Sequence, residues 1–418
     1  MPENFDKHTL KNGMVLLGEQ MKGVESVAFD FMVPSGAAML PEGVCGAANV
    51  IEDWLFRGAG EKNNRTLGDA LDGLGLHRSS SVGSSHITIG STLESSSLHQ
   101  AIDLYADIIL RPQLTDDQFK PARQLVIDEI TALDDDPKQK VMLKLRELFY
   151  PQPLGRSTAG DIEQLRNLTP QKTRQLVSEH FNPAQTIFAV AGKYEFDKIV
   201  SQIERLFETG TKRSAQKIRT EPVAGNYTHI HNEGAQVHIG LMTPTVGPAD
   251  EDYYNARVAI SILAGGMSAR LFTEVREKRG LCYAICARYH CMRGYAGIMS
   301  YAGTTPEKAQ DTIDIIIAEF SRLSDGITAD EIDRAKAGLK SALILQSESS
   351  SARASGTGSD YFFLGRIRSL DEIKEKIEKT NADFVISFLK KNPFKQYSIV
   401  SIGPKEINPP SAQQTRVN

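Results

Sequence analysis

Two stretches, IEQLRNLTPQKTRQLVSEHFNPAQTIFAVAG (residues 162–192) and IKEKIEKTNADFVISFLKKNPFKQYSIVSIG (residues 373–403), share one sequence pattern. Each contains a threonine (Thr169, Thr380), then an amphipathic segment, an Asn-Pro pair and an apolar run. The pattern predicts a helix that ends before Asn-Pro and leads into a buried strand. Because it recurs about half a chain length later, it indicates an internal repeat.

The repeat extends outward from these stretches. Alternating strands open each half, SVAFDFMV near residue 30 and QVHIGLM near residue 240, and several amphipathic helices follow. Strands grouped apart from helices predict α+β domains, each with an antiparallel-rich sheet and helices packed on one face. We expect two homologous domains, residues 1–208 and 227–418, joined by a polar, basic linker at residues 209–226.

Composition excludes several classes of protein. The 418 residues carry a formal net charge of −4, and basic residues occur only in short mixed clusters, so nothing indicates a nucleic-acid-binding surface. No stretch approaches the roughly 18 apolar residues of a membrane helix, and the first residues lack the apolar segment of a signal peptide. We therefore expect a soluble, cytoplasmic protein that binds neither nucleic acid nor membrane.

The segment NVIEDWLFRG (residues 49–58) has helical spacing, with one apolar stripe and a second face that carries Asn49, Glu52 and Asp53. One interpretation is the polar face of an ordinary amphipathic helix. Another is a weak site for calcium or magnesium, because amide and carboxylate oxygens suit these ions better than zinc, which favours nitrogen and sulfur donors.

In the second half, GGMSARLF (residues 265–272) precedes VREKRGLCY (residues 275–283). One interpretation is a charged helix end capped by Gly280, with Arg276 in a surface ion pair and Tyr283 in a sheet. The other is functional, because a planar guanidinium and a phenol are donors that can stabilise an oxyanion.

These segments resemble the pitrilysin/insulinase family of zinc peptidases. That family carries H-x-x-E-H, an apolar pair and a glycine where residues 49–58 stand, and its third zinc ligand is a downstream glutamate. By resemblance, Asn49 and Asp53 occupy the two histidine positions, Glu52 the position of the general base, and Glu129 that of the third ligand. The resemblance therefore implies no metal and no cofactor in this chain.

The second-half segments resemble the family's G-G-x-x-S-R-L and L/V-R-E-K-x-G-L-x-Y motifs. By resemblance, Arg276 would bind a backbone carbonyl of a peptide substrate, and Tyr283 would donate to the scissile carbonyl. The implied protein is the non-zinc subunit of a heterodimer, inactive alone, that completes the active site of a zinc-bearing homologous partner acting on peptides or unfolded proteins.

Two alternatives stay open. The chain could be a scaffold protein, like the respiratory-complex core subunits that share the family's fold and have lost catalysis. It could also be a homodimeric enzyme that binds another metal at Asn49, Asp53 and Glu129.

Overall fold

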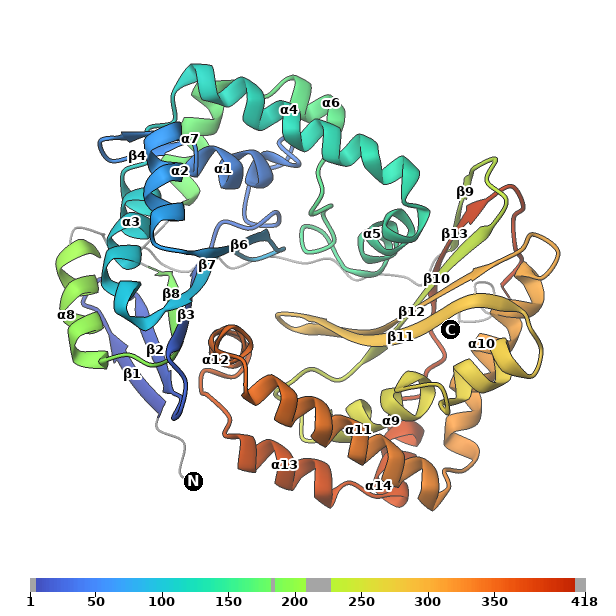
Figure 1. The fold of residues 1–418 in the computed structure, drawn as a ribbon. Helices are drawn as coiled ribbons and strands as arrows, with labels where there is room; N and C mark the ends of the chain where they lie inside the picture. Colours follow the sequence, from blue (N-terminus) through green and yellow to red (C-terminus); the bar gives the residue numbers. More distant parts are fainter. Residues whose placement is uncertain (1–4, 182–184, 208–226, 410–418) are drawn as a thin grey trace. The chain divides into compact units, whose positions relative to one another are not determined.

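The fold is that of a computed structural model, drawn in Figure 1. The structure describes residues 5–181, 185–207 and 227–409. The predicted linker at 209–226 and the Asn182-Pro183 pair of the first repeat lie outside the described residues. The limits of the two homologous halves, at residues 208 and 227, therefore stay a prediction.

The described residues form two compact units, and each contains most of one half of the sequence with a short piece of the other half. The residues of the N-terminal unit fall within 1–132, 152–220 and 346–368, and those of the C-terminal unit within 133–151, 221–345 and 369–418.

The sheet of the N-terminal unit has six strands in the order β1-β2-β8-β3-β7-β6. Neighbouring strands are antiparallel, except that β2 and β8 are parallel. The strand predicted from TIFAVAG is β8, and all six of its residues are buried. The strands are β1 (Phe5–Thr9), β2 (Val15–Gln20), β3 (Ser26–Val33), β6 (His77–Val82), β7 (Ile87–Glu94) and β8 (Ile187–Gly192), and a separate pair is β4 (Gly58–Ala59) and β5 (Lys62–Asn63).

The sheet of the C-terminal unit has five strands in the order β9-β13-β10-β12-β11, and only β9 and β13 are parallel. In order and direction, these five strands correspond to β2, β8, β3, β7 and β6 of the N-terminal sheet. The strand predicted from YSIVSIG is β13, the counterpart of β8. The two-domain α+β prediction is thus confirmed. The strands are β9 (Tyr227–His231), β10 (Val237–Thr245), β11 (Cys282–Met292), β12 (Tyr295–Thr304) and β13 (Ser398–Gly403).

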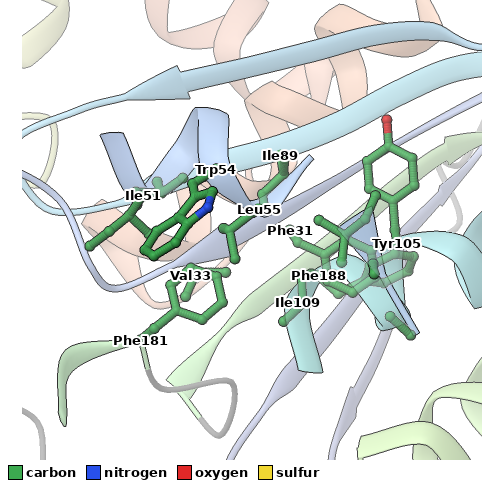
Figure 2. Packing of buried hydrophobic residues seen from close by; sticks show 14 of the residues in the cluster. Phe31, Val33, Ile51, Trp54, Leu55, Ile89, Tyr105, Ile109, Phe181 and Phe188 are labelled. Carbon is green, nitrogen blue, oxygen red and sulfur yellow. The ribbon is translucent and has the colours of Figure 1, made fainter. Parts of the chain in front are cut away.

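Most helices of the N-terminal unit cover one face of its sheet. Phe31 of β3 and Phe188 of β8 point to this face, and their ring centroids lie 4.7 Å apart in the core drawn in Figure 2. In α7, the hydroxyl of Thr169 caps the first turn by accepting from the backbone N–H of Lys172 at 3.2 Å, so the helix begins directly after the threonine of the repeat. The helices are α1 (Ala47–Leu55), α2 (Asn64–Gly73), α3 (Leu98–Leu110), α4 (Asp116–Ala132), α6 (Ile162–Arg166), α7 (Pro170–His180) and α8 (Phe196–Phe207).

The C-terminal unit repeats this layering. Val237, Ile239 and Leu241 of β10 point into a core that the helices of this unit share. No helix in the described part of the chain is long and apolar enough to cross a membrane. The helices are α9 (Tyr253–Ala264), α10 (Ala309–Arg322), α11 (Ala329–Ser347), α13 (Leu370–Lys379) and α14 (Ala382–Lys391), together with a π-helical turn, η4 (Phe272–Glu277).

The prediction left the second face of each sheet uncovered, whereas the structure places one helix on it. In the N-terminal unit this helix is α12 (Ser350–Leu364), and in the C-terminal unit it is α5 (Pro137–Phe149). Both helices approach their sheets closely. A Cβ on Gly358 of α12 would lie 2.8 Å from the sulfur of Met32, and a Cβ on Gly240 of β10 would lie 3.2 Å from a methyl carbon of Leu145 in α5.

A buried ion pair joins α12 to the N-terminal sheet. The guanidinium of Arg353 binds the carboxylate of Glu19 in β2 through two contacts of 2.7 Å, and the Thr357 hydroxyl donates to the same carboxylate at 3.2 Å. The Arg353 and Glu19 side chains are only 10% and 6% exposed. This pair therefore fixes the position of α12 along the sheet.

Candidate functional site

Helix α1 presents its apolar side to the N-terminal core, as the sequence predicted (Figure 2). The indole N–H of Trp54 donates to the carbonyl of Thr115 at 3.1 Å, and the Trp54 ring meets the ring of Phe119 in α4 with centroids 4.9 Å apart. These contacts hold α1 against α4. They place Asn49, Glu52 and Asp53 on the side of α1 that lies away from this core.

The structure brings together three of the four residues at the degenerate zinc positions. Burial raises the pKa of Glu52, and the negative charges of Asp53 and Glu129 raise it further, while a hydrogen bond with Ser80 lowers it. Burial and the charge of Asp53 also raise the pKa of Glu129. The charges of Asp53 and Glu129 thus reach Glu52, and the charge of Asp53 reaches Glu129, so these three carboxyl groups lie within electrostatic range of each other.

These residues do not fit a zinc ion. Both carboxylate oxygens of Asp53 are engaged by Arg57 one turn later, Oδ2 with Nε and Oδ1 with Nη2 at 3.3 Å. The Asn49 side-chain oxygen is buried, with no hydrogen-bond partner among the described residues. No group of three or more His, Cys, Asp or Glu side chains in the described ranges is arranged to hold a metal ion. The guanidinium of Arg57 thus already neutralises the carboxylate of Asp53, which also disfavours the binding of calcium or magnesium.

Arg276 and Tyr283 lie side by side in the C-terminal unit. Arg276 is in the π-helical turn η4, and its guanidinium carbon lies 5.5 Å from the ring centroid of Tyr283 and 4.8 Å from that of Phe272. Tyr283 is 80% exposed. The sequence predicted both residues as a pair of donors, and the structure brings their side chains together on the surface of this unit.

A β-bulge singles out Tyr283. In the pairing of β11 with β12, Cys282 lies opposite Thr304 and Ala284 lies opposite Gly303, so Tyr283 is the extra residue. A bulge re-aims a side chain and often lies next to an active site. Because β11 is the edge strand of its sheet, the bulged Tyr283 stands at an open edge.

The ion pairs around η4 do not include Arg276. Glu274 binds Lys278 and Arg279, each at 2.6 Å, and these contacts lower the pKa of Glu274. No ion pair of Arg276 is found within the described ranges, and its contacts are with aromatic rings. The surface ion pair expected in the purely structural interpretation is therefore absent from this part of the chain, and the Arg276 guanidinium keeps its donors available.

Comparison with known proteins identifies the family. The model of "Insulinase (Peptidase family M16)" matches residues 16–162, and the model of the "Peptidase M16 inactive domain" matches residues 167–339. The chain belongs to the insulinase family. Its expected resemblance to pitrilysin/insulinase peptidases is thereby confirmed.

A relative and two solved structures match nearly the whole chain. A Rickettsia felis protein named "Uncharacterized zinc protease" is 26% identical to this chain over 97% of it and 99% of the relative. The fold is shared with a peptidase M16 inactive-domain structure from Pseudomonas fluorescens, with a TM-score of 0.88 and 19% identity over 98% of this chain and 100% of the other. It is also shared with a chain of complex III2 from Candida albicans, with a TM-score of 0.81 and 20% identity over 96% of each chain.

Proposed function

We propose that this insulinase-family chain is the non-zinc subunit of a heterodimeric zinc endopeptidase, acting in the cytoplasm on peptides or unfolded proteins. The observation that carries the proposal is the contrast between its two candidate sites. The zinc positions hold Asn49 and an Asp53 that is neutralised by Arg57, whereas Arg276 and Tyr283 stand exposed together at an open sheet edge.

In this proposal the metal and the general base belong to a homologous partner with an intact H-x-x-E-H motif. A bound metal there would supply an activated water and polarise the substrate carbonyl. The substrate would add as an extended strand to a sheet edge, because backbone hydrogen bonds hold a peptide with little demand on its sequence. Arg276 would donate to a backbone carbonyl of the substrate.

Tyr283 would donate its hydroxyl proton to the scissile carbonyl as negative charge develops on the oxygen. Such a donor stabilises the transition state more than the ground state, and the loss of one typically costs about 3 kcal/mol. The bulge suits this role because it leaves Tyr283 outside the regular pairing of β11.

A second candidate function is that of a scaffold protein, and the likeness to a chain of complex III2 favours it. Under this alternative, Arg276 and Tyr283 would be retained for packing alone. Two arginine-aromatic contacts are consistent with packing, but the 80% exposure of Tyr283 is not what a packing role requires.

The test is peptide hydrolysis by this chain, by a homologous chain of the same organism that carries an intact H-x-x-E-H motif, and by their mixture, with the zinc content of each measured. The proposal predicts activity in the mixture only and zinc in the partner only. Zinc-dependent activity of this chain alone would overturn the proposal, and a partner whose activity is unaffected by this chain would favour the scaffold.

A further inference from the structure

Beyond Tyr283, strand β11 also carries two basic residues, Arg288 and His290. Cys286, Arg288 and His290 share one face of the strand, since the intervening residues pack toward the helices of the C-terminal core. The face that carries Arg288 and His290 is therefore the one toward α5, the helix that covers the second face of this sheet.

A hydrogen bond fixes α5 against β11. The hydroxyl of Tyr150, the residue that follows α5, lies 2.6 Å from Nδ1 of His290, and the two ring centroids are 5.4 Å apart. Arg146 is one helical turn before Tyr150, and Arg288 is two residues before His290. The hydrogen bond between Tyr150 and His290 therefore brings Arg146 of α5 close to Arg288 of β11.

The pKa shifts of Arg146 and His290 are consistent with this placement of the two arginines. Burial lowers the pKa of Arg146, and the positive charge of Arg288 lowers it further, although Tyr150 and Glu147 act in the opposite direction. Burial and the same two arginines lower the pKa of His290 to about 4, so this imidazole is neutral at physiological pH and adds no third charge.

Neither guanidinium forms an ion pair within the part of the chain that the structure describes. Across the described residues, no hydrogen bond or ion pair is formed by the side chain of Arg146 or Arg288, and Glu147, the residue after Arg146, is bound to Lys144 at 2.7 Å. Two like charges held together, one of them half-buried, are stabilised by an anion between them. A planar guanidinium matches a carboxylate in particular, because it can donate two parallel hydrogen bonds.

We propose that Arg146 and Arg288 form a carboxylate-binding subsite, which makes the chain prefer acidic peptides. This inference rests on the proposed function, because the ligand of the subsite is the substrate of that function, an extended peptide added to the open edge of β11. Arg288 is five residues from Tyr283 along the strand, which at roughly 3.3 Å per residue corresponds to about 16 Å. The subsite thus binds a carboxylate that lies about five residues along the peptide from the scissile bond, whose carbonyl accepts from Tyr283.

The test uses fluorescent peptides with amidated C-termini and one Glu placed five residues before or after the intended cleavage site, and matched peptides with Gln. A third peptide has Gln and a free C-terminal carboxylate at that distance, which separates a side-chain carboxylate from a terminal one. We expect this chain alone to bind a carboxylate peptide about tenfold more tightly than its neutral match, which corresponds to about 1.4 kcal/mol.

The variants are Arg288→Glu and Arg146→Met, with Arg205→Glu on α8 of the other unit as a control for the change in net charge. The inference predicts that Arg288→Glu reverses the preference toward peptides with Lys in place of Glu, that Arg146→Met reduces the preference, and that Arg205→Glu leaves it unchanged. Equal binding of Glu and Gln peptides by the unaltered chain, or equal effects of Arg288→Glu and Arg205→Glu, would overturn it.

Binding and hydrolysis separate the two proposals. If the mixture with the zinc-bearing chain cleaves neutral peptides but shows no preference for acidic ones, only the subsite fails. If the chain binds acidic peptides through Arg288 but never supports hydrolysis, the subsite stands and the proposed catalytic role fails.

Discussion

Replacement of Arg353 by methionine is expected to destabilise the N-terminal unit strongly. Arg353 and Glu19 are 10% and 6% exposed and share two contacts of 2.7 Å, so the substitution leaves a carboxylate in a buried position. The only other partner of this carboxylate in the described structure that we find is the Thr357 hydroxyl at 3.2 Å. Breaking a buried ion pair by removing one partner costs about 3–5 kcal/mol, and methionine preserves most of the side-chain volume, so little of the loss would come from a cavity.

The assay is urea unfolding followed by circular dichroism, in which the free energy of unfolding falls linearly with urea concentration. Arg65→Met is the matched control, because Arg65 pairs with Asp69 at the surface with side chains 87% and 59% exposed, and such pairs contribute about 0–1 kcal/mol. The double variant Glu19→Gln/Arg353→Met should recover part of the loss, since no buried charge is left unpaired. Equal stability of Arg353→Met and Arg65→Met would refute the argument that this pair fixes α12 on the sheet.

Two further predictions concern titration and metal binding. In the folded chain His290 has a pKa of about 4, below its ordinary value of 6.5, so the unfolded chain binds more protons between these two pH values. The contribution to stability is therefore fully present above pH 6.5 and falls by up to about 3 kcal/mol as the pH drops toward 4. His290→Gln should flatten this part of the stability profile, and an unchanged slope would contradict the low pKa of His290. The double variant Asn49→His/Asp53→His releases Arg57 and should bind zinc with Glu129 as the third ligand, as measured by elemental analysis. Addition of Glu129→Gln should weaken zinc binding by roughly 10-fold or more, because loss of even a residue that only orients a ligand costs about 10–100-fold. No zinc in the double variant would show that Glu129 is not placed to act as a ligand.

Much of the fold could be predicted from the repeated stretches. The apolar runs at 187–192 and 398–403 predict buried strands, and the structure places both inside their sheets with every residue buried. The helices on the second faces could not be predicted. The sequence of α12 is rich in serine, glycine and alanine, and its small side chains suit close approach to a sheet without forming a strong apolar stripe.

At the candidate sites, residue types could be predicted but local geometry could not. The pairing of Asp53 with Arg57 follows from their spacing of four residues, a signal that sequence reasoning could have used. The bulge at Tyr283 and the π-helical turn that carries Arg276 have no comparable signal, because each depends on the register of two strands or on the packing of a turn. The pairing of Arg146 with Arg288 was missed for the same reason, since it depends on the contact between Tyr150 and His290.

The role of Tyr283 is tested most directly by the steady-state rate of peptide hydrolysis by the zinc-bearing partner mixed with the Tyr283→Phe chain. The substitution removes one hydroxyl from an 80% exposed side chain, so the fold should be unaffected, and Tyr295→Phe on β12 is the matched control. We expect kcat to fall roughly 100-fold with little change in KM, because the hydroxyl acts mainly in the transition state, while the control keeps its full rate. An unchanged kcat in a mixture that is otherwise active would show that Tyr283 does not complete the partner's active site.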